Sequence, residues 1–595
     1  MEKQSKRRIA VVDPEKCNYL KCSQECINSC PINRSGAECI ILGDRKKVVG
    51  GLDKIAVIDE NLCTGCGICV KRCPYQAIQI VNLPGELDEP THQYGKNTFR
   101  LYGFPMPMKG VVGLVGPNGI GKTTIIKILT GSLIPNQGNF EEKATWEKTI
   151  EKYKGTELQS YLKKIANKEA KLSYKPQDVS KIPLVFNGTV KELIEETGEY
   201  KKELIEELEI EKILEQEVSK ISGGELQRVA IYIALSKKAD FYFFDEPSSY
   251  LDVKQRLKIA RVIKKLGEEK SVFVVEHDLG VLDYLADYVH ILYGKPGVYG
   301  VISTLKNARS GINEFLRGYL KEENIRIRDY EIKFEVKPPS SEWDSKKEVN
   351  YPSFTKSFEK FKLEAEAGTL RSGEVVGILG ANGIGKTTYM KILAGEDEAN
   401  EGEIKLDLKI SYKPQYLDYE KIDLTVDEFI KTQDINFGLF NSEFKRVVSD
   451  LMDKKMNKLS GGEAQRVAIA VALSKEADAI LLDEPSAFLD IEQRFLLSQL
   501  IKRITEKTNA TCLVIDHDIL FQDLVSNRIM VFEGTPAVEG KAYSPTSVHE
   551  GMNLFLKKMG ITFRREPDSG RPRMNKPDSQ KDSEQKQKGE YYYTM

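Results

Sequence analysis

Two short apolar runs along the chain are each followed by a glycine-rich loop and then by a stretch with helical spacing. The runs lie at 109–115 and 374–379, and the helical stretches lie at 124–129 and 388–393. An apolar run of this length beside glycine is typical of a buried strand. The pattern therefore predicts the same strand–loop–helix unit twice, with each loop meeting the N-terminus of a helix, in a chain of the α/β class.

Both loops fit the phosphate-binding pattern G-x-x-x-x-G-K-[ST]. In this pattern the backbone N–H groups and the helix N-terminus bind phosphates, the lysine reaches the β- and γ-phosphates, and the hydroxyl holds Mg²⁺. ATP and Mg²⁺ are therefore the predicted ligands. The residues expected to bind the nucleotide are Gly116, Asn118, Gly119, Gly121, Lys122, Thr123 and Thr124 in the first loop, and Gly380, Asn382, Gly383, Gly385, Lys386, Thr387 and Thr388 in the second.

Further motifs occur twice, in the same order in each half of the chain. Ser-Tyr-Lys-Pro-Gln ends at Gln177 and Gln415, Ser-Gly-Gly-Glu begins at Ser222 and Ser460, and Asp-Glu-Pro begins at Asp245 and Asp483. The interval between the two copies is the same for all three motifs. An ordered set in duplicate indicates an internal repeat of one ATP-binding domain.

The residue types in these motifs indicate the chemistry of ATP hydrolysis. Asp245 and Asp483 are expected to bind Mg²⁺, together with Thr123, Gln177, Thr387 and Gln415. The glutamate after each of these aspartates is expected to polarise the attacking water, and a histidine after an apolar strand is expected to stabilise charge on the γ-phosphate. The predicted catalytic residues are Glu246, Glu484, His277, His517, Gln177 and Gln415.

Nine of the ten cysteines lie between positions 17 and 73. The run at 63–74 has the spacing C-x2-C-x2-C-x3-C-P, in which the fourth cysteine ligates the other cluster of a pair. A second, irregular run at 17–31 also ends in Cys-Pro. The crossed rule predicts two [4Fe–4S] clusters, one on Cys30, Cys63, Cys66 and Cys69, and the other on Cys17, Cys22, Cys26 and Cys73.

Other interpretations of this segment stay open. A structural zinc site usually takes two pairs of ligands, which eight cysteines in two proline-terminated runs fit poorly. Clusters can transfer electrons or can stiffen a small domain, and the absence of any flavin or haem pattern favours the stiffening role. Cys39 is left over and is expected to be a buried thiol.

Composition narrows the possible partners. The net charge is −1, and no apolar run reaches about 18 residues, so neither a general attraction to nucleic acid nor a transmembrane helix is indicated. The N-terminus lacks the apolar core of a signal peptide. We therefore expect a cytoplasmic chain without a membrane partner, in which local basic patches carry any contact with RNA.

Aromatic residues precede each phosphate loop and are candidates for stacking on adenine. Tyr94 is the residue that we assign to this role in the first half. Aromatic residues at such positions can equally belong to a core. The alternatives are Phe99 and Tyr102 in the first half, and Phe354, Phe358 or Phe361 in the second half.

The motifs divide the chain into six predicted segments. An iron–sulfur domain at 1–80 and a first cassette at 81–318, with a helical insertion near 138–171, precede a linker at 319–345. A second cassette at 346–553, a basic segment at 554–576 and a polar tail at 577–595 follow. The insertion is either a solvated charged helix or a docking element for a partner.

The linker and the C-terminal segment are rich in arginine, at 326–328 and at 564–573. These patches are either ordinary solvated charge or contacts to a phosphate backbone. The tail beyond position 577 is low in apolar residues and is expected to be mobile. Its Tyr591-Tyr592-Tyr593 run has no explanation in the sequence.

The duplicated motifs resemble those of ABC ATPases, whose two sites are composite. The resemblance implies that nucleotide on Lys122 is completed by Ser460, and nucleotide on Lys386 by Ser222. The chain would then be a monomer whose halves form an internal head-to-tail pair that ATP closes. The resemblance adds to the nucleotide-binding set Ser222, Gly223, Gly224, Asp245, Asp252, Ser460, Gly461, Gly462, Asp483 and Asp490.

The order of segments resembles the ABCE family, the ribosome-recycling ATPases also called RNase L inhibitors. The resemblance covers nearly the whole chain and is carried by the eight-cysteine layout, by Ile-Ser-Gly-Gly-Glu-Leu-Gln-Arg at 221–228 and by Asp-Glu-Pro-Ser-Ser-Tyr-Leu-Asp at 245–252. This chain departs from the family pattern in two places. Ala464 follows the second Ser-Gly-Gly-Glu motif where Leu226 follows the first, and the tail is particular to this chain. The implied fold is two head-to-tail ABC-type P-loop domains with an N-terminal ferredoxin-like α+β domain.

The same resemblance implies a function. ATP closes the cassettes, the iron–sulfur domain swings against the small subunit and a release factor or its stalled-ribosome counterpart, and the ribosome splits into subunits. The protein then stays on the small subunit and its rRNA, which links recycling to initiation factors. The main alternative is a soluble ABC ATPase that assembles or exports iron–sulfur clusters; a structural or DNA-repair ABC protein and an electron carrier are further ones.

Overall fold

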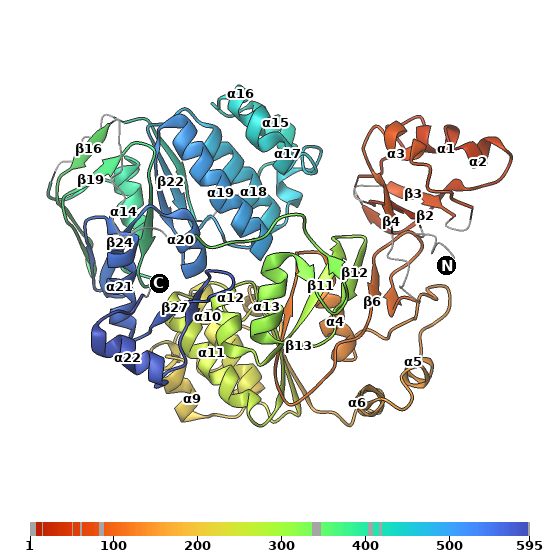
Figure 1. The fold of residues 1–595 in the computed structure, drawn as a ribbon, viewed down its shortest axis with the longest axis horizontal. Coiled ribbons are helices and arrows are strands. Elements are labelled where there is room, and N and C mark those ends of the chain that lie inside the picture. The colour runs from red at the N-terminus through yellow and green to blue at the C-terminus, as the bar shows by residue number, and fades with distance from the viewer. Residues whose placement is uncertain are drawn as a thin grey trace. The chain divides into compact units, whose positions relative to one another are not determined.

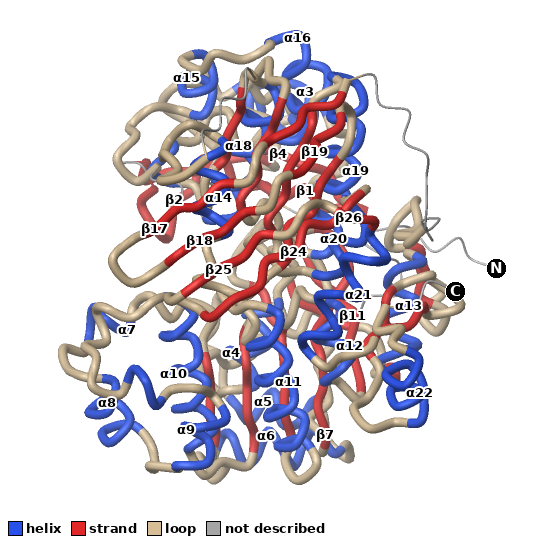
Figure 2. The backbone as a smooth tube through the Cα atoms, turned by 90° about the vertical axis from the view of Figure 1, so that its left-hand side faces the viewer, coloured by secondary structure: helices blue, strands red, loops and turns tan. Residues whose placement is uncertain are grey.

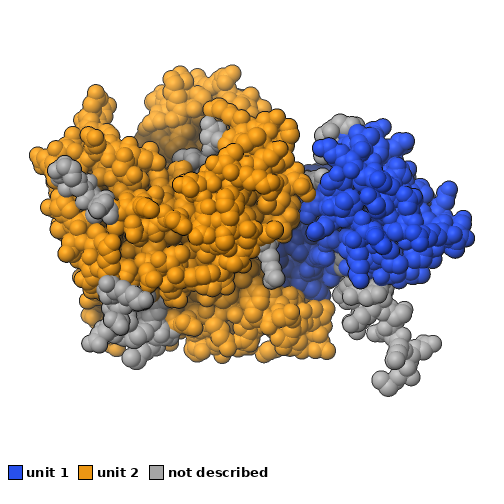
Figure 3. All heavy atoms as spheres, turned by 90° about the horizontal axis from the view of Figure 1, so that it is seen from above, with its two compact units in different colours: residues 1–108, 116–172, 290–305 blue, residues 109–115, 173–289, 306–595 orange. Residues whose placement is uncertain are grey.

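The computed structural model describes residues 8–14, 16–49, 52–59, 62–82, 89–335, 347–402, 408–415 and 419–592. They form two compact units, coloured separately in Figure 3 and drawn as a ribbon in Figure 1. Unit 1 contains residues 1–108, 116–172 and 290–305, and unit 2 contains residues 109–115, 173–289 and 306–595. The domain boundaries proposed from the sequence do not coincide with this division and stay predictions.

The N-terminal part of unit 1 is the small ferredoxin-like α+β domain expected from the cysteine pattern. β1 (Arg8–Val12) pairs with β4 (Ile78–Asn82), and β2 (Ile40–Val49) pairs with β3 (Leu52–Ile58), both antiparallel. The helices are α1 (Glu25–Asn28), α2 (Pro31–Arg34) and α3 (Ile68–Arg72). The core of this domain combines aliphatic residues with Cys30, Cys39 and Cys69. A core of this size needs an additional cross-link to be stable.

A hairpin of unit 1 is tied to this small domain by one buried asparagine. β5 (His92–Gln93) and β6 (Arg100–Tyr102) form the hairpin, and β6 continues through β12 (Tyr299–Ile302) to β11 (Tyr288–Lys295). At the hairpin tip, the Asn97 side chain accepts a hydrogen bond from Ile58 N at 2.8 Å and donates one to Ala10 O at 3.2 Å. Asn97 has φ 56°, a left-handed conformation that asparagine tolerates.

Unit 1 also contains the helices of the predicted insertion. α4 (Lys122–Leu129) follows the first phosphate loop, and α5 (Trp146–Lys152) and α6 (Glu157–Ala166) follow further along the chain. Leu158, Leu162 and Ile165 of α6 are buried, and Tyr161 donates a hydrogen bond to Leu129 O at 2.5 Å. The charged helix α6 therefore packs one apolar face inside unit 1 and leaves its other face exposed.

In unit 2, the first repeat contributes parallel strands with β10 (Ser271–Val275) between β7 (Gly110–Val115) and β9 (Phe241–Asp245). β8 (Leu172–Lys175) lies beside β9, and β13 (Lys306–Asn307) pairs with the first residues of β11. The helices of this part are α7 (Ile182–Val185), α8 (Val190–Thr197), α9 (Lys202–Glu207), η1 (Glu211–Ile213), α10 (Gly223–Ser236), α11 (Val253–Gly267) and α12 (Leu279–Leu285).

The second repeat forms a complete sheet within unit 2, in the order β17-β18-β25-β24-β20-β23-β22-β21 with β26 beside β24. The first four of these strands follow one another in Figure 2. The sheet strands are β17 (Phe354–Ser357), β18 (Lys362–Ala365), β20 (Val375–Leu379), β21 (Ile410–Lys413), β22 (Ala479–Asp483), β23 (Thr511–Ile515), β24 (Arg528–Thr535), β25 (Glu539–Ala542) and β26 (Thr546–Ser547). A separate ribbon pairs β16 (Glu348–Tyr351) with β19 (Gly368–Arg371).

Helices cover this sheet and bury two apolar clusters against it. The strands β20, β22 and β23 are buried along their whole length, which is why they appear in the sequence as continuous apolar runs. The helices are α14 (Lys386–Leu393), α15 (Val426–Lys431), α16 (Phe437–Leu439), η2 (Phe440–Phe444), α17 (Lys445–Val448), η3 (Met456–Lys458), α18 (Gly461–Ser474), α19 (Ile491–Thr508), α20 (Ile519–Val525) and α21 (Val548–Met559).

Arg565, Arg571 and Arg573 of the C-terminal segment form internal ion pairs, in contrast to both interpretations given from the sequence. β27 (Phe563–Arg565) and β28 (Pro572–Met574) form an antiparallel hairpin. Arg571 and Arg573 from this hairpin form ion pairs with Asp283 of α12, at 3.2 and 2.8 Å, and Arg571 is fully buried. Arg565 binds both carboxylate oxygens of Asp523 in α20, at 2.8 and 2.7 Å. The hairpin therefore joins equivalent helices of the two repeats.

The linker arginines are partly internal as well. After α13 (Ala308–Arg317), the short strands β14 (Tyr319–Leu320) and β15 (Ile325–Arg326) form a ribbon. Arg328 is buried and forms an ion pair with Glu492 of α19 at 2.8 Å. Burial lowers the pKa of the Arg328 guanidinium, and the Glu492 charge opposes this shift. Arg328 is thus a structural residue and not a surface contact for RNA.

The tail is folded as far as Tyr592, in contrast to the expectation of mobility. It contains α22 (Gln580–Lys588), and Tyr592 beyond it is fully buried. The Tyr592 hydroxyl donates a hydrogen bond to Asp523 and accepts one from Arg565 at 3.1 Å. Composition alone suggested a solvated segment because the sequence does not show that one aromatic side chain has a buried acceptor. Tyr593 lies outside the described residues.

The ion pairs of Asp283 predict a large and specific loss of stability. Asp283→Ala leaves Arg571 and Arg573 without their carboxylate, and removing one partner of a buried pair costs about 3–5 kcal/mol. Asp568→Ala is the matched control, because Asp568 is more than half exposed and its ion pair with Arg317 is 3.5 Å long; such a pair contributes about 1 kcal/mol or less. Thermal unfolding followed by circular dichroism compares the two. Equal melting temperatures would contradict a structural role for the hairpin.

Candidate nucleotide and iron–sulfur sites

The second phosphate loop lies between β20 and α14, at the carboxyl end of a parallel strand. Its lysine is buried, and Lys386 Nζ donates hydrogen bonds to Gly380 O at 2.9 Å and to Ala381 O at 2.5 Å. Burial lowers the pKa of Lys386 to about 8, against the opposing charges of Glu484, Asp252 and Asp483. A cation held at a helix N-terminus beside backbone N–H groups is suited to bind phosphate.

The acidic and amide residues of the second repeat converge beside this loop. Thr387 Oγ1 donates a hydrogen bond to Asp483 Oδ2 at 2.8 Å, which brings together two predicted Mg²⁺ ligands. Gln415 Nε2 donates to Glu484 Oε1 at 2.8 Å. His517 Nε2 lies 3.4 Å from the same Glu484 oxygen. Asp483, Glu484 and His517 follow the adjacent strands β22 and β23, whose carboxyl ends meet at one edge of the sheet.

The two neighbouring carboxyl groups have opposite pKa shifts. Burial raises the pKa of Asp483 to about 6, and the Thr387 hydrogen bond opposes this rise. Burial also acts to raise the pKa of Glu484, but the hydrogen bond and charge of His517, with Gln415 and Lys386, outweigh it and lower the pKa to about 2. Glu484 is therefore ionised at neutral pH, as a group that polarises water must be.

The first repeat has the same arrangement in unit 2. Gln177 Nε2 donates to Glu246 Oε1 at 2.8 Å, and His277 Nε2 lies 3.5 Å from this oxygen. Both glutamates have a left-handed backbone, with φ 49° at Glu246 and 48° at Glu484. Backbone strain of this kind often accompanies functional positions. Asp245 is buried at the end of β9, immediately before Glu246.

The first phosphate loop belongs to unit 1. Lys122 Nζ donates to Gly116 O at 2.7 Å and to Pro117 O at 2.8 Å, like its counterpart in the second loop. Tyr94 is 43% exposed, and its hydroxyl lies 3.1 Å from Thr124 Oγ1. Tyr94 is thus beside the loop with an accessible ring, as stacking on adenine requires. Tyr102 is buried in the core and lacks such a ring face.

The second-half aromatics divide in the same way. Phe354 is buried in the core, whereas Phe358 is 50% exposed. Phe361 packs against the phosphate loop, since a Cβ on Gly385 would lie 3.0 Å from the Phe361 ring. Gly385 also has φ 91°, so the loop requires glycine there for two reasons.

The two Ser-Gly-Gly-Glu sequences are the signature motifs, and their serines begin long helices. Ser222 and Ser460 form capping boxes with Glu225 and Glu463, at the N-termini of α10 and α18. The second glycine of each motif allows close packing, because a Cβ on Gly224 or Gly462 would lie 2.9 or 3.0 Å from the carbonyl oxygen of Tyr250 or Phe488. These carbonyls belong to the segments before Asp252 and Asp490. Each signature helix is therefore in direct contact with the following acidic loop, and the other signature glycines, Gly223 and Gly461, adjoin the Tyr250 and Phe488 rings.

A residue of the first repeat reaches the phosphate loop of the second. Asp252 Oδ2 accepts a hydrogen bond from Asn382 N at 3.1 Å, and Asn382 Nδ2 contacts Tyr250 O at 3.5 Å. The Tyr250 and Phe488 rings of the two repeats meet edge to face at 6.0 Å. This is the head-to-tail geometry expected from the sequence. The reciprocal role of Ser460 and Asp490 at the first loop stays a prediction.

One functional candidate was missed in the sequence although it occurs in duplicate. Lys175 and Lys413 stand in the two Ser-Tyr-Lys-Pro-Gln motifs and are buried. Lys175 Nζ donates to Asp245 O at 2.8 Å, and Lys413 Nζ donates to Asp483 O at 2.7 Å. Burial lowers both pKa values to about 8. Each lysine thus fixes the backbone under a catalytic carboxylate, and its repetition was the available signal.

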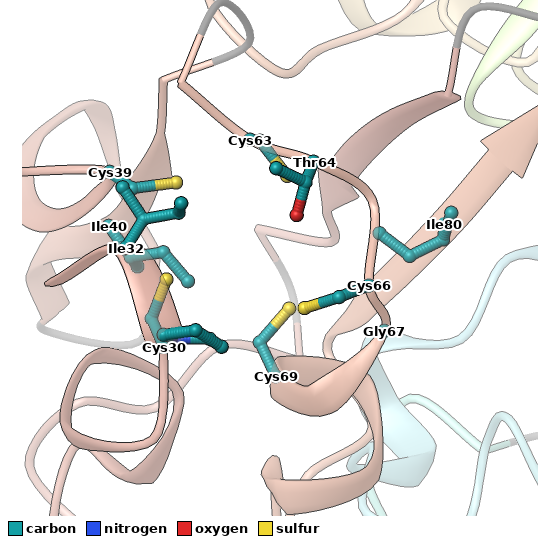
Figure 4. Close-up of a pocket in the computed structure, with 11 residues that line it drawn as sticks. Cys30, Ile32, Cys39, Ile40, Cys63, Thr64, Cys66, Gly67, Cys69 and Ile80 are labelled. Atoms are coloured by element: carbon teal, nitrogen blue, oxygen red, sulfur yellow. The ribbon is translucent and has the colours of Figure 1, made fainter. Parts of the chain in front are cut away.

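The N-terminal cysteines fall into two groups. Figure 4 shows one cavity lined by Cys30, Cys39, Cys63, Cys66 and Cys69, with the sulfurs of Cys66 and Cys69 directed toward one another. The other group is Cys17, Cys22, Cys26 and Cys73: burial raises the pKa of the Cys26 thiol, and the nearby charges of Cys73, Cys17 and Cys22 raise it further. Apart from Cys39, these are the two sets given by the crossed rule.

The donor set fits iron–sulfur clusters better than zinc. A structural zinc site takes four ligands around one point, whereas five cysteines, Cys30, Cys39, Cys63, Cys66 and Cys69, line one cavity here. Burial raises the pKa of Cys26 to about 12 and that of Cys69 to about 11. Thiolates at these positions therefore need a strongly positive centre nearby.

Cys39 is not an isolated thiol. It is buried, lines the same cavity as Cys30 and Cys63, and has a pKa raised to about 12 by burial and by these two neighbours. The sequence predicted its burial but not its position, because its spacing matches neither cysteine run.

No helix among the described residues is long and apolar enough to span a membrane.

Comparisons with known proteins agree with both kinds of site. A family model described as ABC transporter matches residues 102–249 and 363–487. A 4Fe-4S binding domain matches residues 56–79, and a possible Fer4-like domain in RNase L inhibitor, RLI, matches residues 7–38. The second of these models covers the irregular cysteine run, for which the spacing alone gave the weaker prediction.

Full-length relatives show the same combination. ABC transporter E family member 1 of Arabidopsis thaliana is 46% identical over 98% of each chain, and translation initiation factor RLI1 of Saccharomyces cerevisiae is 43% identical over 98% of each chain. A solved structure described as a model of ribosome-bound archaeal Pelota and ABCE1 is 50% identical, covers 99% of each chain and has a TM-score of 0.91. With its twin cassettes and its iron–sulfur domain, the chain belongs to the ABCE family of ABC ATPases, the RNase L inhibitor family.

Proposed function

We propose that this protein is an ATP-driven ribosome recycling factor of the cytoplasm. It splits ribosomes into subunits after termination or stalling, together with a release factor or its stalled-ribosome counterpart, and then stays on the small subunit. The solved neighbour is a ribosome-bound ABCE1 with Pelota, and the yeast relative is a translation initiation factor. The proposal that ATP joins the two repeats rests on the hydrogen bond from Asn382 N to Asp252. This bond places a residue of one repeat at the phosphate loop of the other.

The contact makes the second site complete only when the repeats are together. Lys386 and the N-terminus of α14 bind the phosphates, and Ser222 at the N-terminus of α10 is the residue of the first repeat proposed to complete the site. Glu484, ionised and hydrogen-bonded by Gln415, takes up a proton from the attacking water, and His517 stabilises charge on the γ-phosphate. Hydrolysis removes the group that joins the two faces, so the repeats can separate. Glu246 and His277 of the first repeat are proposed to act in the same way.

Mg²⁺ fits a set of oxygen donors that the structure brings together. Thr387 and Asp483 are hydrogen-bonded to each other, and Gln415 lies next to them through Glu484. When bound there, Mg²⁺ neutralises charge on the β- and γ-phosphates. In the first repeat, Thr123, Asp245 and Gln177 are the residues that the sequence predicts for Mg²⁺. Asp245 and Gln177 are linked to the same glutamate-centred group of the first repeat.

Two [4Fe–4S] clusters are the proposed cross-links of the N-terminal domain. Cys30, Cys63, Cys66 and Cys69 hold one, and Cys17, Cys22, Cys26 and Cys73 hold the other. Clusters at both positions cross-link a domain whose apolar core is small. Their proposed role is rigidity, so that the domain transmits force to its ribosomal partner as one body.

The tie at Asn97 connects this rigid domain to the first nucleotide site. The hairpin that carries Asn97 also carries Tyr94, and Tyr94 contacts Thr124 of the phosphate-loop helix. All these residues belong to unit 1. A change at the first phosphate loop is therefore passed to the iron–sulfur domain through one short hairpin, and the moving domain acts on the small subunit.

Ribosome splitting measured on sucrose gradients tests the function. The wild-type protein with ATP and a release factor should convert monosomes into subunits. Glu246→Gln/Glu484→Gln should lower ATP turnover by about 10²–10⁴-fold, the usual contribution of a general base, and should not split ribosomes repeatedly. Wild-type protein without nucleotide is the control. A protein that sediments apart from ribosomal particles in every nucleotide state would contradict the assignment.

Removal of the hairpin tie should separate ATP hydrolysis from splitting. Asn97→Ala deletes both hydrogen bonds to the N-terminal domain and leaves the nucleotide residues in place. We expect ATP turnover within about twofold of wild type and a clear loss of splitting, because a buried hydrogen-bonded side chain contributes about 1–3 kcal/mol. Lys96→Ala is the matched control, since Lys96 is a neighbouring and more exposed contact to Asp59 at 3.4 Å. Unchanged splitting by Asn97→Ala would exclude the tie as the route of coupling.

Iron analysis tests the two-cluster assignment. Cys69→Ser removes a buried ligand of one cluster and should lower the iron content of anaerobically prepared protein from about eight to about four atoms per chain. Cys512→Ser is the control, because Cys512 is buried in the second repeat, far along the chain from the other cysteines. Full iron content in Cys69→Ser, or a metal content of one or two zinc ions in the wild type, would refute the assignment.

A further inference from the structure

Two arginine–aspartate pairs of unit 2 are buried at equivalent positions of the two repeats. Arg256 of α11 binds Asp278 at 2.8 Å, and Arg494 of α19 binds Asp518 at 2.6 Å. Asp278 and Asp518 directly follow the histidines His277 and His517. All four side chains are less than 15% exposed. Four buried charges are costly to desolvate, so stability alone does not account for them.

Each arginine holds two segments of its own repeat together. Arg256 Nε donates to Leu251 O at 2.8 Å, and Arg494 Nε donates to Leu489 O at 3.0 Å. These carbonyls lie directly before Asp252 and Asp490. One guanidinium therefore fixes both the acidic loop that begins its own helix and the aspartate that follows the histidine. The fork geometry of arginine allows this double contact, and a lysine ammonium does not reproduce it.

The aspartates are fixed on their other side by helix N-termini. Asp278 Oδ1 accepts hydrogen bonds from Gly280 N and Val281 N at the start of α12. Asp518 Oδ1 accepts them from Leu520 N and Phe521 N at the start of α20. Neither aspartate can shift without moving the backbone next to its histidine. The position of each guanidinium is therefore transmitted to the neighbouring histidine.

The two pairs also touch across the repeats. Arg494 Nη1 lies 3.4 Å from His277 O, so the second-repeat arginine directly contacts the backbone of the first-repeat histidine. Burial raises the pKa of Asp278 to about 6, and the next largest contribution is the negative charge of Asp518. Burial acts to lower the pKa of the Arg256 guanidinium, as does the charge of Arg494. The charges of Asp278 and Asp518 outweigh both and raise this pKa. The four groups thus share one electrostatic environment.

These contacts form a continuous path between the two nucleotide sites. Asn382 of the second phosphate loop donates to Asp252, the residue after Leu251. Leu251 is held by Arg256, Arg256 binds Asp278, and Asp278 adjoins His277 of the first site. A displacement of the second phosphate loop therefore moves a group that acts on nucleotide in the first site. Each link is a hydrogen bond or a peptide bond.

We propose that Arg256 is a positioning residue that reports nucleotide occupancy of the second site to His277 of the first site, with Arg494 closing the contact from the other repeat. This inference rests on the proposed ATPase function and assigns the coupling between its two sites to one side chain. Arg256 does not touch the nucleotide in this role. It acts by holding Leu251 and Asp278 at a fixed separation.

The test measures how the first site responds to the state of the second. Glu484→Gln keeps ATP bound at the second site, because Lys386 is intact, and Lys386→Ala empties that site. Turnover in either background comes from the first site. We expect the two rates to differ by about fivefold or more, the usual range of coupling between sites. Adding Arg256→Lys should bring the two rates within about twofold of each other.

The choice of lysine keeps the chain folded, because the positive charge beside Asp278 remains. Arg261→Gln is the matched control, since Arg261 is an exposed arginine of the same helix, and it should leave the rate ratio unchanged. First-site ATP affinity, measured by filter binding in the same backgrounds, gives a second ratio that does not depend on hydrolysis and should collapse in the same way.

The possible results are distinct. A ratio that persists in Arg256→Lys overturns the relay, and so does a ratio near one in the chain with intact Arg256. Absence of ATP turnover in the unsubstituted protein contradicts the proposed function instead, and the affinity ratio then decides the relay by itself. Loss of the ratio in Arg256→Lys but not in Arg261→Gln supports the assignment.

Discussion

The hydrogen bond between Asp252 and the backbone of Asn382 is the constraint on which the rest of unit 2 depends. A backbone N–H of a phosphate loop is a donor meant for an anion, and here an aspartate of the other repeat binds it. The same loop therefore senses both nucleotide and partner repeat. Gly224 and Gly462 closely approach the carbonyl oxygens of Tyr250 and Phe488, so each acidic loop lies against the signature helix of its own repeat.

Near-symmetry explains much of the charge in the interior. Asp283 and Asp523 stand at equivalent places after the two histidines, and one C-terminal hairpin supplies arginines to both. The Arg256–Asp278 and Arg494–Asp518 pairs are a second set of equivalent buried ion pairs. Their aspartates lie at the N-termini of the same two helices, α12 and α20. Buried ion pairs are poor devices for stability alone but good ones for fixing a single arrangement. They hold the two repeats in a defined register.

The sequence predicted the parts of this molecule that depend on local spacing. Phosphate loops, signature helices and their capping residues are read from a few adjacent positions, and Ser222 and Ser460 are found where the pattern put them. The crossed cysteine grouping rests on ligand spacing, which the size of the cluster sets, and it stays a prediction. Family membership followed from the order of these local motifs.

Features that depend on distant partners were not predictable. The arginines at 565, 571 and 573 looked like surface charge, because their aspartates lie some distance back in the chain and in two different repeats. Tyr592 looked like part of a solvated tail for the same reason, and Cys39 matched no spacing. In each case a tertiary contact overrides the composition of the segment.

The C-terminal hairpin and Tyr592 determine which contacts can form while the chain is being synthesised. Both repeats precede this segment in the chain, and ribosomes deliver a chain from its N-terminus onward. The two cassettes can fold as they emerge. The contacts of the C-terminal hairpin and Tyr592 with α12 and α20 can form only when synthesis has passed position 592. Until then the two cassettes lack the ion pairs of Asp283 and Asp523 with the arginines of the hairpin.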